Sequence, residues 1–403
     1  MHEALAGLLI LAATPTSAID TSQAPMQATE PAPPIVVTGI PIQGYRDRLD
    51  ACLARNCPTD EDVDATLALA EAMFLNGDYG DGRQVVRASI SRNRRHAAAF
   101  PEPVSDLFRA HSRLSRHLGY DDQAARSTYD ILRSLRAGLP QEDHRHFTAR
   151  MEIADLQMMM GNANRARREL RELAEVARAS GREDVAVLAE LRTLWFDYLV
   201  DRHGDARSRL TDMAREPGQG LRSTGAKILL ARIYRSEGHA ERADALLAEV
   251  GAGTSQRRRL ISSPSFALHM QEVTNALDMV ADSGAGPSLG NVLALGNVRN
   301  RIPDDFRDKW IDVGFWVLPD GRVSGLEVVR RSSRDRWDDP LLEAIEGRVY
   351  STAPEATYRL ERYTYTSSYE TLTGTRLPMH SPRARVEYMD LTANAPPTVP
   401  GAN

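Results

Sequence analysis

Cys52 and Cys57, the only cysteines in the chain, are the residues whose type and spacing most directly suggest chemistry. On a continuous helix, a separation of five residues puts two residues about 7.5 Å apart along the axis, beyond the usual Cα span of a disulfide. Pro58 follows Cys57, however, and a residue before proline avoids helical geometry, so we expect the helix to end near Asn56. No nearby cysteine or histidine completes a zinc site, so we expect a small structural disulfide.

Catalytic chemistry has little support in the sequence. The chain contains neither a His-Glu-x-x-His nor a Gly-x-Ser-x-Gly motif, and the glycine-rich run up to Gly296 lacks the Gly-Lys-Ser/Thr ending of a phosphate loop. His144 and His146 point to different faces of a helix. His111 and His117 lie among arginines, where we expect them to be solvated. We therefore predict a protein that is not an enzyme and needs neither metal nor cofactor.

A helical and repetitive region extends from Thr59 to about Val250. At four places a glycine is followed five residues later by a small residue, and a degenerate copy begins at Asp201. The copies start 42, 42, 40 and 37 residues apart. In such a register the first residue ends one helix and the small residue lets an antiparallel helix approach closely. The copies are Gly77…Gly82, Gly119…Ala124, Gly161…Ala166, Asp201…Ala206 and Gly238…Ala243.

The last copy resembles a tetratricopeptide repeat in Leu230-Ala231, Tyr234, Gly238, Ala243 and Leu247. The spacing departs from the 34 residues usual for that family, so lengthened helices or loops are expected. The resemblance implies an α-helical solenoid whose stacked hairpins form a concave surface for peptides or proteins. The alternative is a generic antiparallel α-helical bundle without a regular register.

The C-terminal part of the chain has the pattern of a small sheet. Ile311 to Val317 alternates apolar residues with others, as a strand with one buried face does. Pro319 and Gly321 suit a tight turn after it. A second strand, a helix with Leu342, Ile345 and Val349 on one face, and a further strand follow. These three elements are expected at about 323–331, after Asp338-Asp339-Pro340, and at about 358–369.

Together these motifs resemble the C-terminal domain of TonB-type energy transducers. The motifs are Val313-Gly314-Phe315-Trp316-Val317, Asp320-Gly321-Arg322-Val323, Ser332-Ser333, Leu341 to Ile345, and Tyr350 to Pro354. The resemblance implies a small α+β domain with the order β-β-α-β and an antiparallel sheet; the alternative is some other small α/β sheet.

In the transducer family, the strand after the helix pairs with a short segment of a TonB-dependent outer-membrane receptor. The corresponding edge here is expected at Arg359, Leu360, Glu361, Arg362, Tyr363, Thr364, Tyr365 and Thr366. A further strand-like run, Arg385 to Leu391, would close this edge if it paired there.

The N-terminus resembles an export signal, with an apolar run from Ala4 to Ala13 and small residues before Ile19. About twenty apolar residues are needed to span a bilayer, so this run is too short to be a membrane anchor. The leader contains neither lysine nor arginine, which either a true start upstream or a cytoplasmic protein with an apolar start would explain. The expected divisions are a signal peptide at 1–18, a disordered tether at 19–50 with a β-prone segment at 35–39, repeats at 51–282, a linker at 283–300, the sheet domain at 301–392 and a disordered tail at 393–403.

The net charge of −5 favours neither a nucleic-acid-binding protein nor a membrane-spanning bundle. Three functions therefore compete. The first is a non-enzymatic periplasmic scaffold that binds proteins, such as TonB-dependent receptors or other envelope proteins. The second is an energy transducer anchored in the inner membrane, and the third, which the motifs disfavour, is an enzyme.

Overall fold

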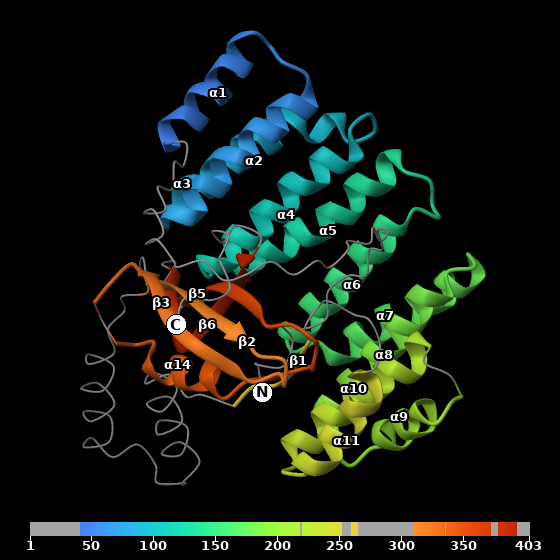
Figure 1. Ribbon diagram of the computed structural model, residues 1–403. Helices are drawn as coiled ribbons and strands as arrows, with labels where there is room; N and C mark the ends of the chain where they lie inside the picture. The colour runs from blue at the N-terminus through green and yellow to red at the C-terminus, as the bar shows by residue number, and fades with distance from the viewer. Residues whose placement is uncertain are drawn as a thin grey trace, which may run out of the picture.

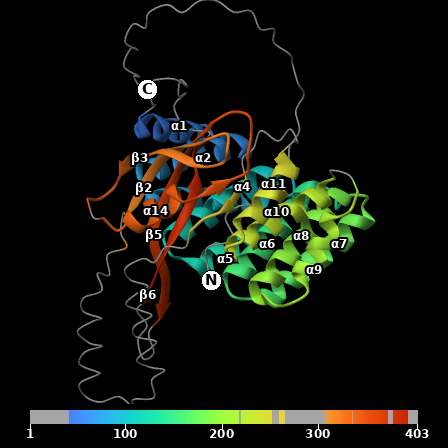
Figure 2. The same ribbon diagram turned by 60° about the horizontal axis from the view of Figure 1, so that its bottom comes forward.

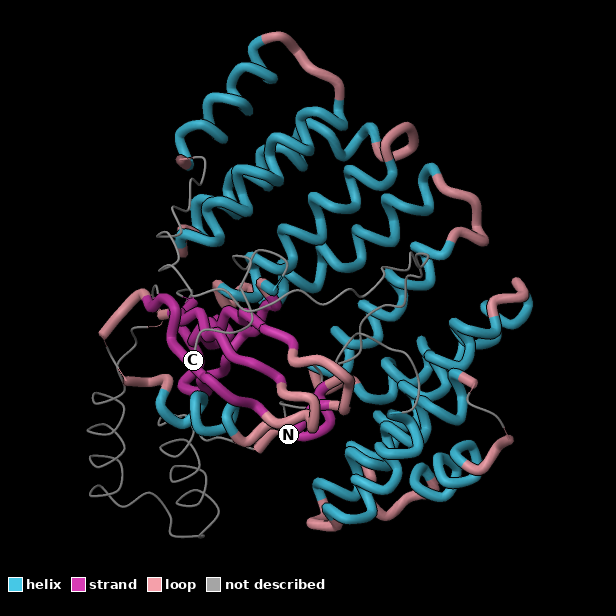
Figure 3. The backbone as a smooth tube through the Cα atoms, viewed as in Figure 1, coloured by secondary structure: helices cyan, strands magenta, loops and turns pink. Residues whose placement is uncertain are grey.

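The computed structural model describes residues 41–217, 220–251, 259–264, 306, 309–334, 336–371 and 378–392. In these residues, an array of helices is followed by a small antiparallel sheet (Figures 1 and 3). The predicted signal peptide, β-prone segment, linker and tail lie outside the described residues. No helix of the described part is both long and apolar enough to cross a membrane.

The array consists of a first helix and five antiparallel hairpins. The first helix, α1 (Ile42–Ala54), packs on the second through Leu49, which belongs to one core cluster with Leu69 and Met73. Residues 42–50, which we assigned to the tether, are therefore helical, because this contact buries an apolar face. The hairpins are α2 (Thr59–Asn76) with α3 (Tyr79–Asn93), α4 (Pro101–His117) with α5 (Asp121–Gly138), α6 (His144–Met159) with α7 (Ala163–Ala179), α8 (Glu183–Val200) with α9 (Ala206–Ala214), and α10 (Leu221–Ser236) with α11 (Ala240–Gly251).

The turn inside four of the five hairpins follows the register predicted from the sequence; in the remaining one, that of α8 and α9, Asp201 is extended and α9 begins only at Ala206. The four glycines that begin a copy all have positive φ, between 76° and 93°, which favours glycine. The small residues five positions later are buried against the partner helix. Their exposed fractions are 1% for Ala124, 0% for Ala166, 2% for Ala206 and 0% for Ala243.

The sheet has four strands in the order β3-β2-β5-β6, with all neighbours antiparallel. The element order β-β-α-β is that expected from the sequence, with β6 added after it. The predicted helix ends at Glu346, before Gly347, so Val349 lies in a short strand and not on the helix face. The elements are β2 (Trp310–Val317), β3 (Val323–Arg331), α14 (Asp339–Glu346), β4 (Val349–Tyr350), β5 (Thr357–Thr371) and β6 (Pro378–Asp390).

The four-stranded sheet packs against one end of the array, and a separate two-stranded sheet of β1 (Leu260–Ser262) and β4 contacts the other end. The helices form an arc, and the sheet lies in its opening (Figure 1). At one end, Trp310 and Leu360 share a core with Phe74 of α2 and Leu107 of α4. At the other, β1 pairs with β4, while its Ile261 packs into the core of α10 and α11. Figure 2 shows the long strands β5 and β6 running past α4 and α5.

Candidate functional site

The disulfide expected between Cys52 and Cys57 is present, with the two Cα atoms 5.2 Å apart. Helix α1 ends at Ala54, and Asn56 adopts a positive φ of 52°, which turns the chain back. The amide of Cys57 then donates to the carbonyl of Cys52 over 3.1 Å. Among the described residues, one group has its potential ligand atoms close enough to hold a metal ion, namely these two cysteines and Glu61. Two of its three sulfur and oxygen ligands are the sulfur atoms of the disulfide, which are already bonded to each other.

The strand edge predicted to capture a partner is not free. Arg359 to Thr366 lies in β5, which pairs with β2 on one side and with β6 on the other. The C-terminal run around Arg385, which the sequence identified as a competitor for this edge, occupies it. Strand β6 supplies a continuous row of backbone partners from Asp390 to Ala384 and is held to α4 and α5 by side chains, so the β5 edge is closed.

Two edges of the sheet remain without a partner strand among the described residues. Strand β3 is irregular, because Gly325 has a φ of 60° and the register with β2 shifts near it. Such a bulge impairs pairing with a further strand. The outer edge of β6 between Ala384 and Asp390 is regular, since its register with β5 does not shift there.

A buried arginine joins the sheet to the first hairpin. Arg362 of β5 is fully buried and forms an ion pair with Asp312 of β2, its Nη2 lying 2.9 Å from Oδ2. The same guanidinium donates to the carbonyls of Phe74 and Leu75, which end α2. It also lies 3.8 Å from the centre of the Trp310 ring. Sequence reasoning missed this pair, although Asp312, the one charged residue in the otherwise apolar strand β2, was a visible signal.

A second arginine repeats this arrangement at the next hairpin. Arg385 of β6 binds both carboxylate oxygens of Asp121 at 2.6 Å and donates to the carbonyl of Arg116 at the end of α4. Burial alone would raise the pKa of Asp121, but the bond and charge of Arg385 lower it. The amide of Tyr369 donates to the carbonyl of Gly119 over 3.1 Å. The sheet therefore binds the ends of two successive repeats in an equivalent way.

His117 and His111 are buried, contrary to the expectation that they are solvated. His117 is 4% exposed, and its Nδ1 lies 2.8 Å from Oγ1 of Thr364 on β5. His111 is 7% exposed, and its Nδ1 lies 2.8 Å from Oγ of Ser127. The repeat register contained the signal: His111 lies eight residues before its turn glycine, as does the buried Leu69.

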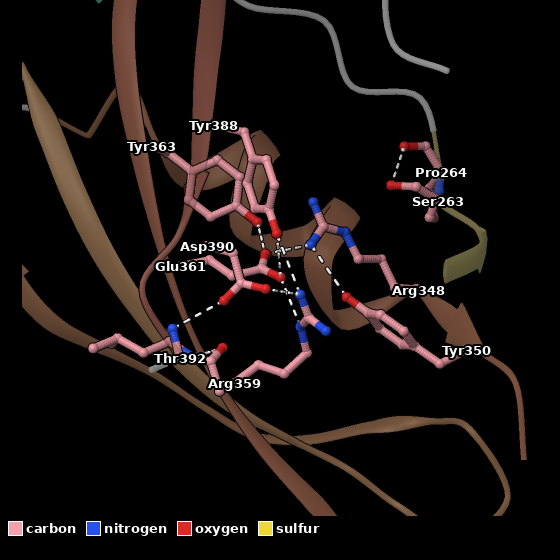
Figure 4. Close-up of polar contacts among 11 residues, drawn as sticks. Ser263, Pro264, Arg348, Tyr350, Arg359, Glu361, Tyr363, Tyr388, Asp390 and Thr392 are labelled. Carbon is pink, nitrogen blue, oxygen red and sulfur yellow. Dashed lines mark hydrogen bonds and ion pairs between the residues drawn. The ribbon is translucent and has the colours of Figure 1, made fainter. Parts of the chain in front are cut away.

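A second polar cluster lies on the opposite face of β5 (Figure 4). Glu361 is 1% exposed and accepts hydrogen bonds from Arg348, Arg359, Tyr363 and Tyr388. Burial and the neighbouring Glu361 carboxylate raise the pKa of Tyr363 well above its usual value. Each carboxylate oxygen has two partners, so this cluster stabilises the sheet and has no acceptor left for a ligand.

We call inner the face of the first helices of the hairpins that, in α10, contacts β1. It carries one residue per repeat at the same register position, six residues before the turn. These residues are Glu71, Arg113, Asp155, Trp195 and Arg232. The last of them donates through Nη2 to the carbonyl of Leu260, 2.5 Å away in β1, so this face already holds one extended segment of the chain. Asp155 binds Arg192 at 3.0 Å, but its Oδ1 has no partner among the described residues. Burial raises the pKa of Asp155 to about 6, against the effect of Arg192.

Comparison with known proteins yields similar folds only. No family model and no curated protein matches the chain. The chain is similar to the structure of BtubC (BKLC) from P. vanneervenii, with 16% identity, coverage of 56% of this chain and 96% of that one, and a TM-score of 0.39. A putative kinesin light chain from Podosopora anserina, described as having TPR-like repeats, has 14% identity, coverage of 48% and 94%, and a TM-score of 0.36. The apo quorum sensor NprR from B. thuringiensis has 15% identity, coverage of 52% and 58%, and a TM-score of 0.37.

Proposed function

We propose that this protein is a non-enzymatic scaffold of the bacterial cell envelope, exported to the periplasm, whose helical repeats bind a protein partner in extended form. The apolar leader with small residues before Ile19 motivates the location. The disulfide between Cys52 and Cys57 supports it, because such bonds persist in oxidising compartments.

The contact between Arg232 and the backbone of β1 carries this proposal. It provides a physical example, within the chain itself, of the inner face holding an extended segment by its carbonyl. Two repeats earlier, the same register position holds Asp155, whose Oδ1 lacks a partner. Met151 and Met158 lie four residues before and three residues after Asp155, on the same side of α6, and both are partly buried against the core of this repeat, as is Trp195. An extended peptide that offers apolar side chains and a hydrogen-bond donor to Asp155 fits this stretch of α6 and α8.

Site-specific photocrosslinking in cells tests the proposal. We expect a photoreactive residue at Met158, on the inner side of α6, to capture a discrete partner, and the same residue at the exposed Val176 of α7 to capture none. Asp155→Ala should reduce capture at Met158. Equal capture at both positions, or no effect of Asp155→Ala, would contradict an inner-face site. Cell fractionation of the same strains tests export, because a cytoplasmic protein would end the envelope proposal.

The second candidate is an inner-membrane energy transducer, and the order β2, β3, α14, β5 favours it. The TonB-like resemblance implies this order, and the sheet in the structure follows it. Because β6 closes the β5 edge, strand capture in this protein would use the outer edge of β6. Recovery in the inner-membrane fraction would favour this candidate, whereas recovery in the soluble periplasmic fraction favours the scaffold.

A further inference from the structure

The contact between the end of α4 and strand β5 contains an unusual hydrogen-bonded centre. Oγ1 of Thr364 lies 2.8 Å from Nδ1 of His117 and 3.0 Å from the hydroxyl of Tyr79. All three side chains are at least 96% buried. The imidazole contacts the ring of Phe74 edge-on, with centroids 5.0 Å apart, and the ring of Tyr79 at 5.4 Å. His117 therefore belongs to the helices but hydrogen-bonds to the sheet, in an apolar and aromatic surrounding.

Among the described residues, the charged groups around His117 leave no unpaired anion for an imidazolium. Each of the three carboxylates in this interface is already paired with an arginine: Asp312 with Arg362, Asp121 with Arg385, and Glu387 with Arg116 at 2.7 Å. The titratable and charged groups come from six elements, namely Asp312 of β2, Tyr79 of α3, Arg113 and Arg116 of α4, Asp121 of α5, Arg362 of β5, and Arg385, Glu387 and His380 of β6. A proton on His117 would be buried among cations.

We propose that His117 is an acid-sensitive latch between the two parts of the molecule. The neutral imidazole fastens β5 to α4 through Thr364, and protonation releases the sheet from the first two hairpins. The release exposes the apolar surface that Trp310 and Leu360 now bury against Phe74 and Leu107.

The direction of the pH dependence follows from the imidazole's surroundings. Burial, and then the charges of Arg116 and Arg362, hold the pKa of His117 well below its ordinary value of 6.5 in the docked form. Well above pH 6.5 the imidazole is neutral in both forms, so docking keeps its full strength. Below it, only the released form takes up the proton, and the opening equilibrium rises about tenfold between pH 7.5 and pH 5.5. The lowered pKa of Asp121 confines its contribution to more acidic solutions.

Hydrogen exchange on the full-length protein tests the latch. The probes are overlapping peptides that contain the amide of Tyr369, which is bonded across the interface to the carbonyl of Gly119. Peptides from α7 and α8 serve as the internal reference. After correction for intrinsic rates, we expect the protection of the interface peptides to fall about tenfold between pH 7.5 and pH 5.5, with the reference unchanged.

Three neutral variants identify the responsible group. His117→Asn keeps a hydrogen-bonding group near the Nδ1 position and cannot be protonated, so its interface protection should not vary with pH. His380→Asn and His111→Asn should retain the decrease, because His380 lies on β6 and His111 bonds to Ser127 within the helices. No decrease in the wild type, an equal decrease in α7 and α8, or a decrease that persists in His117→Asn would each overturn the latch. If His117→Asn does not fold, His117→Gln replaces it. The pH dependence of interface protection in the wild type then still tests whether acid weakens the contact.

Discussion

Charged side chains inside strands are the residues that connect the two parts of this protein. Arg362 and Asp312 are both fully buried, which is costly for either charge alone. The cost is offset because the guanidinium donates to one carboxylate and to two carbonyls at the end of α2, where helix carbonyls lack partners. The partial negative charge of a helix C-terminus also favours a cation there. Arg362 therefore holds the sheet and the helix by one side chain.

Replacing Arg362 should be far more damaging than replacing its neighbour on the same carboxylate. Arg362→Leu removes the buried partner of Asp312 and one donor from each of the carbonyls of Phe74 and Leu75, so we expect a loss of about 3–5 kcal/mol in the free energy of unfolding. Arg330 also binds Asp312, at 2.6 Å, but its side chain is 47% exposed. Arg330→Leu should cost about 1 kcal/mol or less. Denaturant titration measures both, and similar losses would show that the buried contacts of Arg362 are weaker in solution than the structure indicates.

At the scale of elements, the turn glycines were predictable and their second role was not. The spacing of Gly77 and Gly119 predicted helix ends, because a residue with positive φ ends a helix. No local pattern indicates that the sheet approaches both turns. A Cβ on Gly77 would lie 2.2 Å from Nε1 of Trp310, and one on Gly119 would lie 2.0 Å from the carbonyl oxygen of Ser367. Such a contact joins residues about 240 positions apart, which local periodicity does not encode.

Two alanine variants separate the turn from the docking contact. Gly119 and Gly161 have nearly the same φ, 79° and 76°, so alanine at either costs about 1–2 kcal/mol in backbone strain. At Gly161 the added methyl meets no atom within 4 Å. At Gly119 it meets the β5 backbone, and we expect a further loss of roughly 1–3 kcal/mol. Equal melting temperatures for the two variants would mean that the sheet does not rest on this turn.

At the scale of the whole molecule, the sequence predicted the parts but not their assembly. Amphipathic periodicity, turn glycines and alternating strands are local patterns, so the five hairpins and the β-β-α-β order could be predicted from them. The sequence left open whether β6 closes the β5 edge, and the backbone pairing of the two strands shows that it does. The burial of His117 depends on Thr364, 247 residues away. The sequence therefore predicted two folded parts, and the packing of the sheet into the arc of the helices is visible only in the structure.

This packing predicts that the helices and the sheet unfold together. The sheet shares a core with α2 and α4 at one end, and β1 ties β4 to α10 and α11 at the other, so neither part buries its apolar surface alone. Thermal unfolding followed by helical circular dichroism and by tryptophan fluorescence should show one transition with the same midpoint, since Trp310 lies in the shared core. Arg362→Leu should separate the two midpoints, with fluorescence changing first, because it removes the hydrogen bonds from the sheet to the carbonyls of Phe74 and Leu75 in α2. Two separate transitions in the wild type would instead describe independent domains that merely touch.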